Sequence, residues 1–161
     1  MTRDAVTSDQ LPPSGLPFSV AVRGGGLLFL SGQVAQDPAT GELVDGDVAQ
    51  QADQIPRNIA ATLAAIGKDL DDVIWVGVYL TDMSQFGAMN SAYRRHFAEP
   101  YPARTAIGVA ALPLGGQKAA QNWSVYAQDP CCNPPAAAGH SRQRGARVDF
   151  ESQSVTGLVG V

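Results

Sequence analysis

The strongest constraint on the fold is the order in which two kinds of apolar pattern occur along residues 18–112. Two apolar runs, FSVAVR (18–23) and LLFLSG (27–32), are separated only by glycines and predict a β-hairpin. Residues 36–47, QDPATGELVDGD, are rich in turn formers and predict a loop. The continuous apolar run DVIWVGVYL (72–80) predicts a buried strand, and TAIGVAAL (105–112) predicts another.

Two amphipathic helices are predicted between these strands. Asp47 can cap the first, Gly67 ends it, and apolar residues follow at three- and four-residue steps: Val48, Ala52, Ile55, Ile59, Leu63 and Ile66. Pro56 lies inside this helix and predicts a kink or a split, because an interior proline costs about 3 kcal/mol or more. Ser84 can begin the second helix, with an inner face of Phe86, Met89, Tyr93 and Phe97. The order β-β-α-β-α-β predicts an α+β fold, a mixed sheet with two helices on one face.

The chain of 161 residues is interpreted as one domain with an extension at each end. Residues 1–15 are polar and rich in proline, and predict a flexible arm. The domain is placed at residues 16–127, where WSVYA (123–127) is the last possible strand. Residues 128–161 are rich in Gly, Ala, Pro and Ser. They predict a low-complexity, disordered tail, because such a segment buries too little apolar surface to offset its ordering entropy.

Composition argues against several classes of function. The net charge of −4 is not that of a nucleic-acid-binding protein. The two cysteines, Cys131 and Cys132, are adjacent, and His96 and His140 are isolated, so neither a metal site nor a cofactor is expected. No apolar run has the length of a signal peptide or a membrane span, and a cytoplasmic location is expected.

Arg104 is the one charged residue in YPARTAIGVAALPLGG (101–116). Its planar fork of donors fits a carboxylate in a bidentate manner, and Pro102 stiffens the segment that carries it. This placement suits a small anionic ligand. The alternative is an ordinary surface arginine, or one paired with an acid distant in sequence, because burial of an unpaired charge is costly.

Four segments together resemble the RidA family, also called YjgF or L-PSP. They are LFLSGQVAQDPATGELV (28–44), the helix at 51–67 with Asn58, VGVYLTDMSQFGAMNSAYRRHF (76–97) and YPARTAIGVAALPLG (101–115). The resemblance covers residues 16–115. It implies a chorismate-mutase-like fold that forms homotrimers with ligand clefts between subunits. It also implies hydrolysis of reactive 2-imino acids, such as 2-iminobutanoate and 2-iminopropanoate, to 2-keto acids and ammonia without a cofactor.

The resemblance also assigns site residues. Arg104 matches the catalytic arginine that holds the substrate carboxylate, Gly32 matches a backbone position lining the cleft, and Asn90 matches an asparagine near the pocket. Ala106 stands where many members have Cys, and Phe18 where deaminases usually have Tyr; both are assigned to substrate binding. Alternatives stay open, since Gly32 can serve a tight turn, Asn90 can bridge backbone groups and Phe18 can belong to the core.

The chain departs from the family after Gly115. There the family has a strand of the type K-V-E-I-E-x-x-A, in which an acid positions the hydrolytic water in deaminases. This chain has GQKAAQNWSVYAQ (116–128), and no Glu or Asp occurs between Glu99 and Asp129. Either a divergent member or a reading-frame change explains the difference. Loss of the last strand would leave an unpaired sheet edge and disturb the trimer, unless WSVYA replaces it.

Three functions therefore remain after sequence analysis. The first is an imine deaminase that depends on Arg104, and the second is a protein that binds a small carboxylate without turnover. The third is a ribonuclease or translation inhibitor, an activity attributed to some family members, which the acidic balance disfavours.

Overall fold

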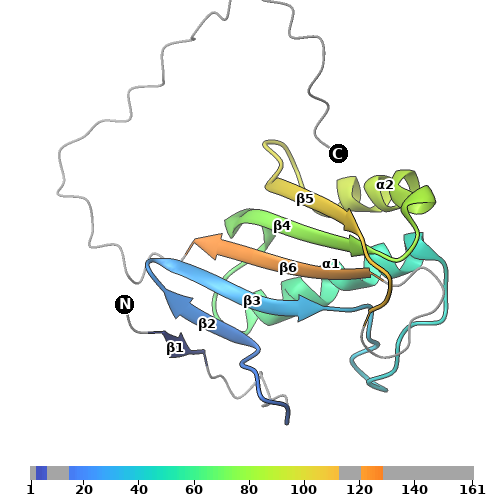
Figure 1. Cartoon of the computed structure of the whole chain (residues 1–161). Helices are drawn as coiled ribbons and strands as arrows, with labels where there is room; N and C mark the ends of the chain where they lie inside the picture. The colour runs from blue at the N-terminus through green and yellow to red at the C-terminus, as the bar shows by residue number, and fades with distance from the viewer. Residues whose placement is uncertain (1–2, 7–14, 113–120, 129–161) are drawn as a thin grey trace, which may run out of the picture.

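The computed structural model describes residues 3–6, 15–112 and 121–128, which form a mixed sheet with two α-helices (Figure 1). The sheet has six strands in the order β1-β2-β3-β6-β4-β5. The strands are β1 (Asp4–Ala5), β2 (Ala21–Gly24), β3 (Leu27–Gln33), β4 (Val73–Leu80), β5 (Ala103–Gly108) and β6 (Gln121–Gln128). The helices are α1 (Val48–Ala64) and α2 (Phe86–His96), with short 3-10 turns η1 (Leu70–Asp72) and η2 (Met83–Gln85). The predicted α+β architecture is confirmed.

Strand β6 lies in the middle of the sheet, antiparallel to both β3 and β4. It contains WSVYA, the last possible strand in the sequence, and Tyr126 pairs with Phe29 on one side and Trp75 on the other. Of the two alternatives left open, a lost last strand and its replacement by WSVYA, the structure has the second: β6 is present, and the edge strands are β1 and β5. Strand β5 runs parallel to β4, and α2 forms the crossover that a parallel pair requires.

Both helices cover the same face of the sheet (Figure 1). The core lies between them and the sheet, and its completely buried apolar side chains include those of Ile55, Ile59 and Leu63 from α1 and those of Val76, Val78 and Leu80 from β4. The alternation along β4 puts Trp75 and Tyr79 on the opposite face. The apolar run of β4 is thus continuous because both of its faces carry apolar side chains.

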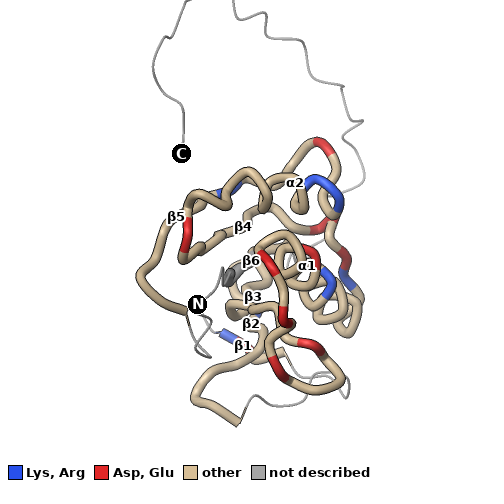
Figure 2. Tube along the Cα trace, turned by 90° about the vertical axis from the view of Figure 1, so that its right-hand side faces the viewer, with Lys and Arg blue, Asp and Glu red and all other residues tan. Residues whose placement is uncertain are grey.

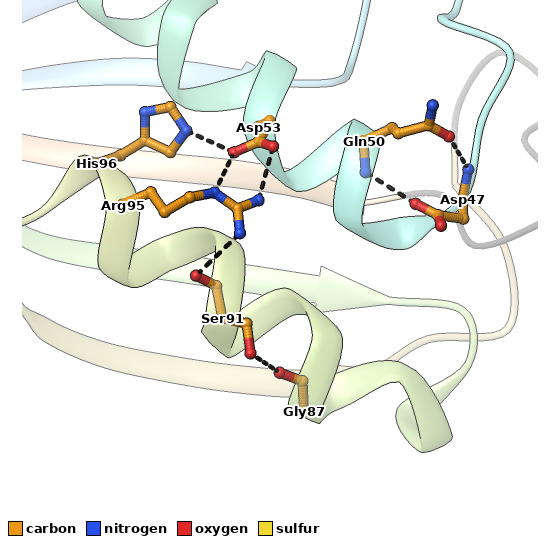
Figure 3. A network of polar contacts seen from close by, with 7 residues as sticks. All are labelled: Asp47, Gln50, Asp53, Gly87, Ser91, Arg95 and His96. Carbon is orange, nitrogen blue, oxygen red and sulfur yellow. Dashed lines mark hydrogen bonds and ion pairs between the residues drawn. The ribbon is translucent and has the colours of Figure 1, made fainter.

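Helix α1 begins at the predicted cap. The Asp47 carboxylate accepts a hydrogen bond from the Gln50 backbone N–H, and the Gln50 side-chain oxygen accepts one from the Asp47 N–H, each at 2.9 Å (Figure 3). The helix runs without a break from Val48 to Ala64 with Pro56 buried inside it, so the predicted split does not occur. Gly67, at a φ of 73°, turns the chain away just after the helix.

Several boundaries differ from those predicted. Strand β2 begins at Ala21 rather than at residue 18, and β5 ends at Gly108 rather than at residue 112. Asp82, not Ser84, caps the turn before α2, because its carboxylate accepts the Ser84 N–H at 2.9 Å. Within the predicted arm, β1 pairs with β2. The predictions for residues 113–120, for the cysteine pair, for His140 and for the tail from residue 129 fall outside the described residues.

A charged cluster joins the two helices on their outer side (Figure 3). Arg95 on α2 donates to the Asp53 carboxylate on α1 from Nη2 at 2.6 Å and from Nε at 3.2 Å. His96 Nε2 lies 2.8 Å from the same carboxylate. The hydrogen bond from Arg95, with that from His96, holds the pKa of Asp53 below its ordinary value. We call Asp53, Arg95 and His96 the helix clip.

Candidate functional site

Arg104 lies on edge strand β5, and its side chain is directed toward helix α2. Its Cζ atom is 4.7 Å from the ring centroid of Tyr93 and 5.5 Å from that of Phe86. Its Nη1 atom lies 4.0 Å from the Met89 sulfur. Among the described residues no carboxylate pairs with Arg104, and the ion pairs found there belong to the helix clip. The half-buried guanidinium therefore rests on aromatic faces, and no acid of the described residues neutralises its charge.

A pocket of about 270 Å³ opens beside this guanidinium. Its lining residues come from α2, from the segment before β5 and from β5 itself, and they are Asn90, Tyr93, Arg94, Tyr101, Pro102 and Arg104. We call it the arginine pocket. None of these residues is an acid. The predicted proximity of Asn90 and Arg104 is thus present in the geometry, and two arginines share the pocket.

Tyr93 cannot act as a base in this pocket near neutral pH. Burial raises the pKa of its phenol to about 12, although the nearby Arg104 charge lowers it somewhat. The phenol is therefore uncharged at pH 7. Two arginines and Asn90 line the pocket, with no carboxylate among the described residues that line it.

The remaining predicted residues lie elsewhere on the sheet. Phe18 is 50% exposed and borders a second pocket of about 580 Å³ together with Arg3, Phe29 and Ser31. Gly32 follows Ser31 and is exposed. Strand β2, which follows Phe18, lies four strand spacings from β5. This separation is about 19 Å at the usual distance between neighbouring strands. Within one copy of the chain, Phe18 and Arg104 therefore belong to two separate pockets.

Ala106 is buried, with 7% of its surface exposed, and lies two residues after Arg104 on the same side of β5. It does not line the arginine pocket. In this structure Ala106 belongs to the cluster of buried apolar residues that forms the core.

Sequence reasoning missed two features of the site. It assigned Tyr93 only to the core, but the predicted inner face of the second helix contains Phe86, Met89 and Tyr93, which are the three residues that contact Arg104. The three- and four-residue spacing of these side chains on one face of the helix was the sequence signal for this contact. Asn58 had no assigned role; its side chain donates to the backbone carbonyls of Val34 and Gln36 at 3.2 and 2.8 Å and fixes the segment after Gly32.

In the described ranges, His, Cys, Asp and Glu side chains form no group of three or more that could hold a metal ion. The longest described helix, α1, has 17 residues, and no helix there is long and apolar enough to cross a membrane.

Comparison with known proteins gives consistent matches. The family model described as Endoribonuclease L-PSP matches residues 8–118. Protein DfrA of Myxococcus xanthus is 44% identical over 119 residues, which are 73% of this chain and 91% of that protein. The 2-iminobutanoate/2-iminopropanoate deaminase of Bos taurus is 38% identical over 117 residues, 73% of this chain and 85% of the enzyme.

A solved structure agrees with the fold. The crystal structure of RidA from an Antarctic Psychrobacter species is similar with a TM-score of 0.69 and 37% identity, covering 78% of this chain and 98% of that one. The matched family region contains Arg104, Asn90 and the whole of the arginine pocket. From its sequence and its fold alike, the chain belongs to the RidA/YjgF family, also called L-PSP.

Proposed function

We propose that this protein hydrolyses small reactive 2-imino acids to 2-keto acids and ammonia, with Arg104 holding the substrate carboxylate. The observation that carries the proposal is the Arg104 guanidinium, which faces a pocket and has no carboxylate partner among the described residues. Relatives named 2-iminobutanoate/2-iminopropanoate deaminase, at 36–38% identity, support the same reaction class.

The carboxylate of a 2-imino acid is bonded directly to the imine carbon. A bidentate contact with Arg104 therefore also fixes the position of the carbon that water attacks. Water adds to this carbon, the electron pair of the C=N bond moves to nitrogen, and nitrogen takes a proton. Collapse of the resulting carbinolamine forms the C=O bond and releases ammonia, so the reaction consumes one water and needs no oxidant or reductant.

Among the described residues that line this pocket, none is an acid or base of the usual kind for the proton transfers. Arg104 stays protonated, the Tyr93 pKa of about 12 keeps its phenol neutral, and residues 121–128 of β6 contain no Asp or Glu. A positioned general acid or base typically contributes a factor of about 10²–10⁴. We therefore expect proton transfer through water and a correspondingly slower enzyme.

The test is the hydrolysis of freshly formed imine. An amino-acid oxidase generates the imine and semicarbazide traps what remains, so an active deaminase lowers the amount of trapped product. The wild type is expected to lower it and Arg104→Ala is not. Equal trapping with the wild type and with buffer contradicts the proposed hydrolysis.

A second candidate is a protein that binds small carboxylates without turnover. The lack of an acid among the described residues of the arginine pocket favours it. The same assay separates the two functions when it is combined with a binding measurement. Stabilisation by 2-oxobutyrate without imine hydrolysis supports the binding protein, and hydrolysis excludes it as the whole function.

A ribonuclease function has less support, although the matching family model bears that description. Figure 2 shows Lys and Arg scattered over several elements among Asp and Glu. RNA binding normally needs a basic face that neutralises phosphates. We expect no RNA binding at low salt; a salt-dependent complex would restore this candidate.

We further propose that the active form is a homotrimer whose clefts join the arginine pocket of one copy to the Phe18 pocket of the next. Two features support this. The two pockets are separated within one copy, and the sheet face away from the helices carries a row of touching rings, Phe29, Tyr126 and Trp75, with centroids 4.8 Å apart. Ile107, with 45% of its surface exposed, lies on that face.

Assembly can be measured directly. Light scattering of the purified protein is expected to give three times the mass of one chain, and an Ile107→Asp substitution is expected to lower it. A wild-type protein that hydrolyses imines as a single copy would contradict the shared cleft.

A further inference from the structure

The arginine pocket contains one more cation than a simple 2-imino acid can use. Arg94 from the last turn of α2 and Arg104 from β5 both line it, and none of its six lining residues is acidic. A single carboxylate is fully served by one bidentate guanidinium. Arg94 is exposed and Arg104 half-buried, and two arginines at one pocket give it a positive potential, which a ligand with two negative groups would neutralise.

Arg94 differs from its neighbour Arg95 in a way that points to a ligand. Both lie in the last turn of α2, where the helix dipole favours any cation. Arg95 is bound by Asp53 and by the Ser91 carbonyl. Arg94 lines the pocket instead, and within residues 3–6, 15–112 and 121–128 it has no ion pair.

We propose that the arginine pocket accepts a 2-imino acid whose side chain ends in a second carboxylate, with Arg104 holding the carboxylate beside the imine and Arg94 the distal one. The inference rests on the proposed function for the reaction, but its binding part can be tested alone. Asn90 also lines the pocket, and its side-chain amide is a further hydrogen-bonding group for such a ligand. The volume of about 270 Å³ suits a small dicarboxylic acid.

The experiment compares two unreactive product-like acids, 2-oxobutyrate with one carboxylate and 2-oxoglutarate with two, by titration calorimetry at low salt. The wild type is expected to bind 2-oxoglutarate about tenfold more tightly, the effect of one further charged hydrogen bond. Arg94→Ala is expected to remove this preference while leaving the affinity for 2-oxobutyrate within twofold of that of the wild type. Arg94→Lys, which keeps the charge, retains part of the preference.

Arg57→Ala is the matched control. Arg57 is exposed on α1 outside the arginine pocket, so its removal changes the net charge equally without touching the site. It is expected to leave both affinities unchanged. If Arg57→Ala weakens the binding of 2-oxoglutarate as much as Arg94→Ala does, the effect comes from the overall electrostatic field of the protein, and the inference is wrong.

The remaining outcomes separate this inference from the proposed function. Arg94→Ala without effect, or with equal loss for both acids, overturns the role of Arg94 and leaves imine hydrolysis standing. An Arg94-dependent preference without imine hydrolysis supports the dicarboxylate site and contradicts the reaction. No binding of either acid by the wild type contradicts the dicarboxylate site, while hydrolysis of a simple imine in that protein would still support the proposed reaction.

Discussion

Two arginines, Arg95 on helix α2 and Arg104 on strand β5, have opposite surroundings. Arg95, in the helix clip, meets the Asp53 carboxylate at 2.6 Å and links α2 to α1. Arg104 approaches the other side of the helix from β5 and finds aromatic rings and a sulfur atom in place of an acid. Neutralised charge marks a structural contact, while a positioned and unneutralised charge beside a pocket marks a binding site.

The largest expected difference is in ligand binding by Arg104→Ala. A hydrogen bond to a charged group is worth about 1.5–3 kcal/mol, so we expect 2-oxobutyrate to bind about 10–100-fold more weakly. The unfolding free energy should change little, because Arg104 has no acid partner among the described residues to lose. Calorimetric titration and urea denaturation measure the two quantities. Arg104→Lys is the companion variant, which keeps the charge without the fork.

For Asp53→Asn we expect the reverse of this result, a loss of stability with little change in ligand affinity. This change removes the charge that binds Arg95 and His96, and a partly exposed pair of this kind contributes up to about 1 kcal/mol. Unfolding should need less urea, whereas 2-oxobutyrate affinity should stay within twofold. A large loss of affinity in Asp53→Asn would show that the clip also shapes the arginine pocket and would break the distinction between the two regions.

Local patterns in the sequence were sufficient for much of this fold. The cap at Asp47, the apolar spacing of α1 and the run at β4 predicted elements that the structure contains. The unbroken path of α1 through Pro56 was not predictable, because burial of the proline and packing around it offset a local penalty. The central place of β6 depends on long-range pairing with β3 and β4, which local pattern does not encode.

The candidate site was predictable only in part, for a similar reason. Arg104 stood out as a lone charge, and family resemblance added Asn90. The role of Arg94 depends on which side of α2 faces the segment before β5, and that is a tertiary relation. Phe18 and Gly32 were grouped with Arg104 by resemblance; within one copy Phe18 lines a different pocket and Gly32 lines neither pocket, although it follows Ser31 of the Phe18 pocket.

The helix clip should also give stability a dependence on pH that the arginine pocket lacks. Because the folded pKa of Asp53 lies below its ordinary value of 3.8, its pairing stabilises the fold above about pH 4 and is lost as pH falls through the folded pKa. The difference in unfolding free energy between wild type and Asp53→Asn should therefore be larger near pH 6 and shrink toward pH 3. A difference that persists unchanged at pH 3 would mean that the carboxylate charge is not what stabilises the clip.

The smallest expected effect concerns the ring that lies farther from Arg104. Phe86 is 5.5 Å from the guanidinium, and a cation–π contact at a partly exposed position is worth about 0.5 kcal/mol. Phe86→Leu should therefore weaken 2-oxobutyrate binding only about twofold, whereas Phe86→Tyr, which keeps a ring, should not. If both variants bind as the wild type does, the Tyr93 ring at 4.7 Å is sufficient to position Arg104, and the aromatic support of the pocket reduces to one residue.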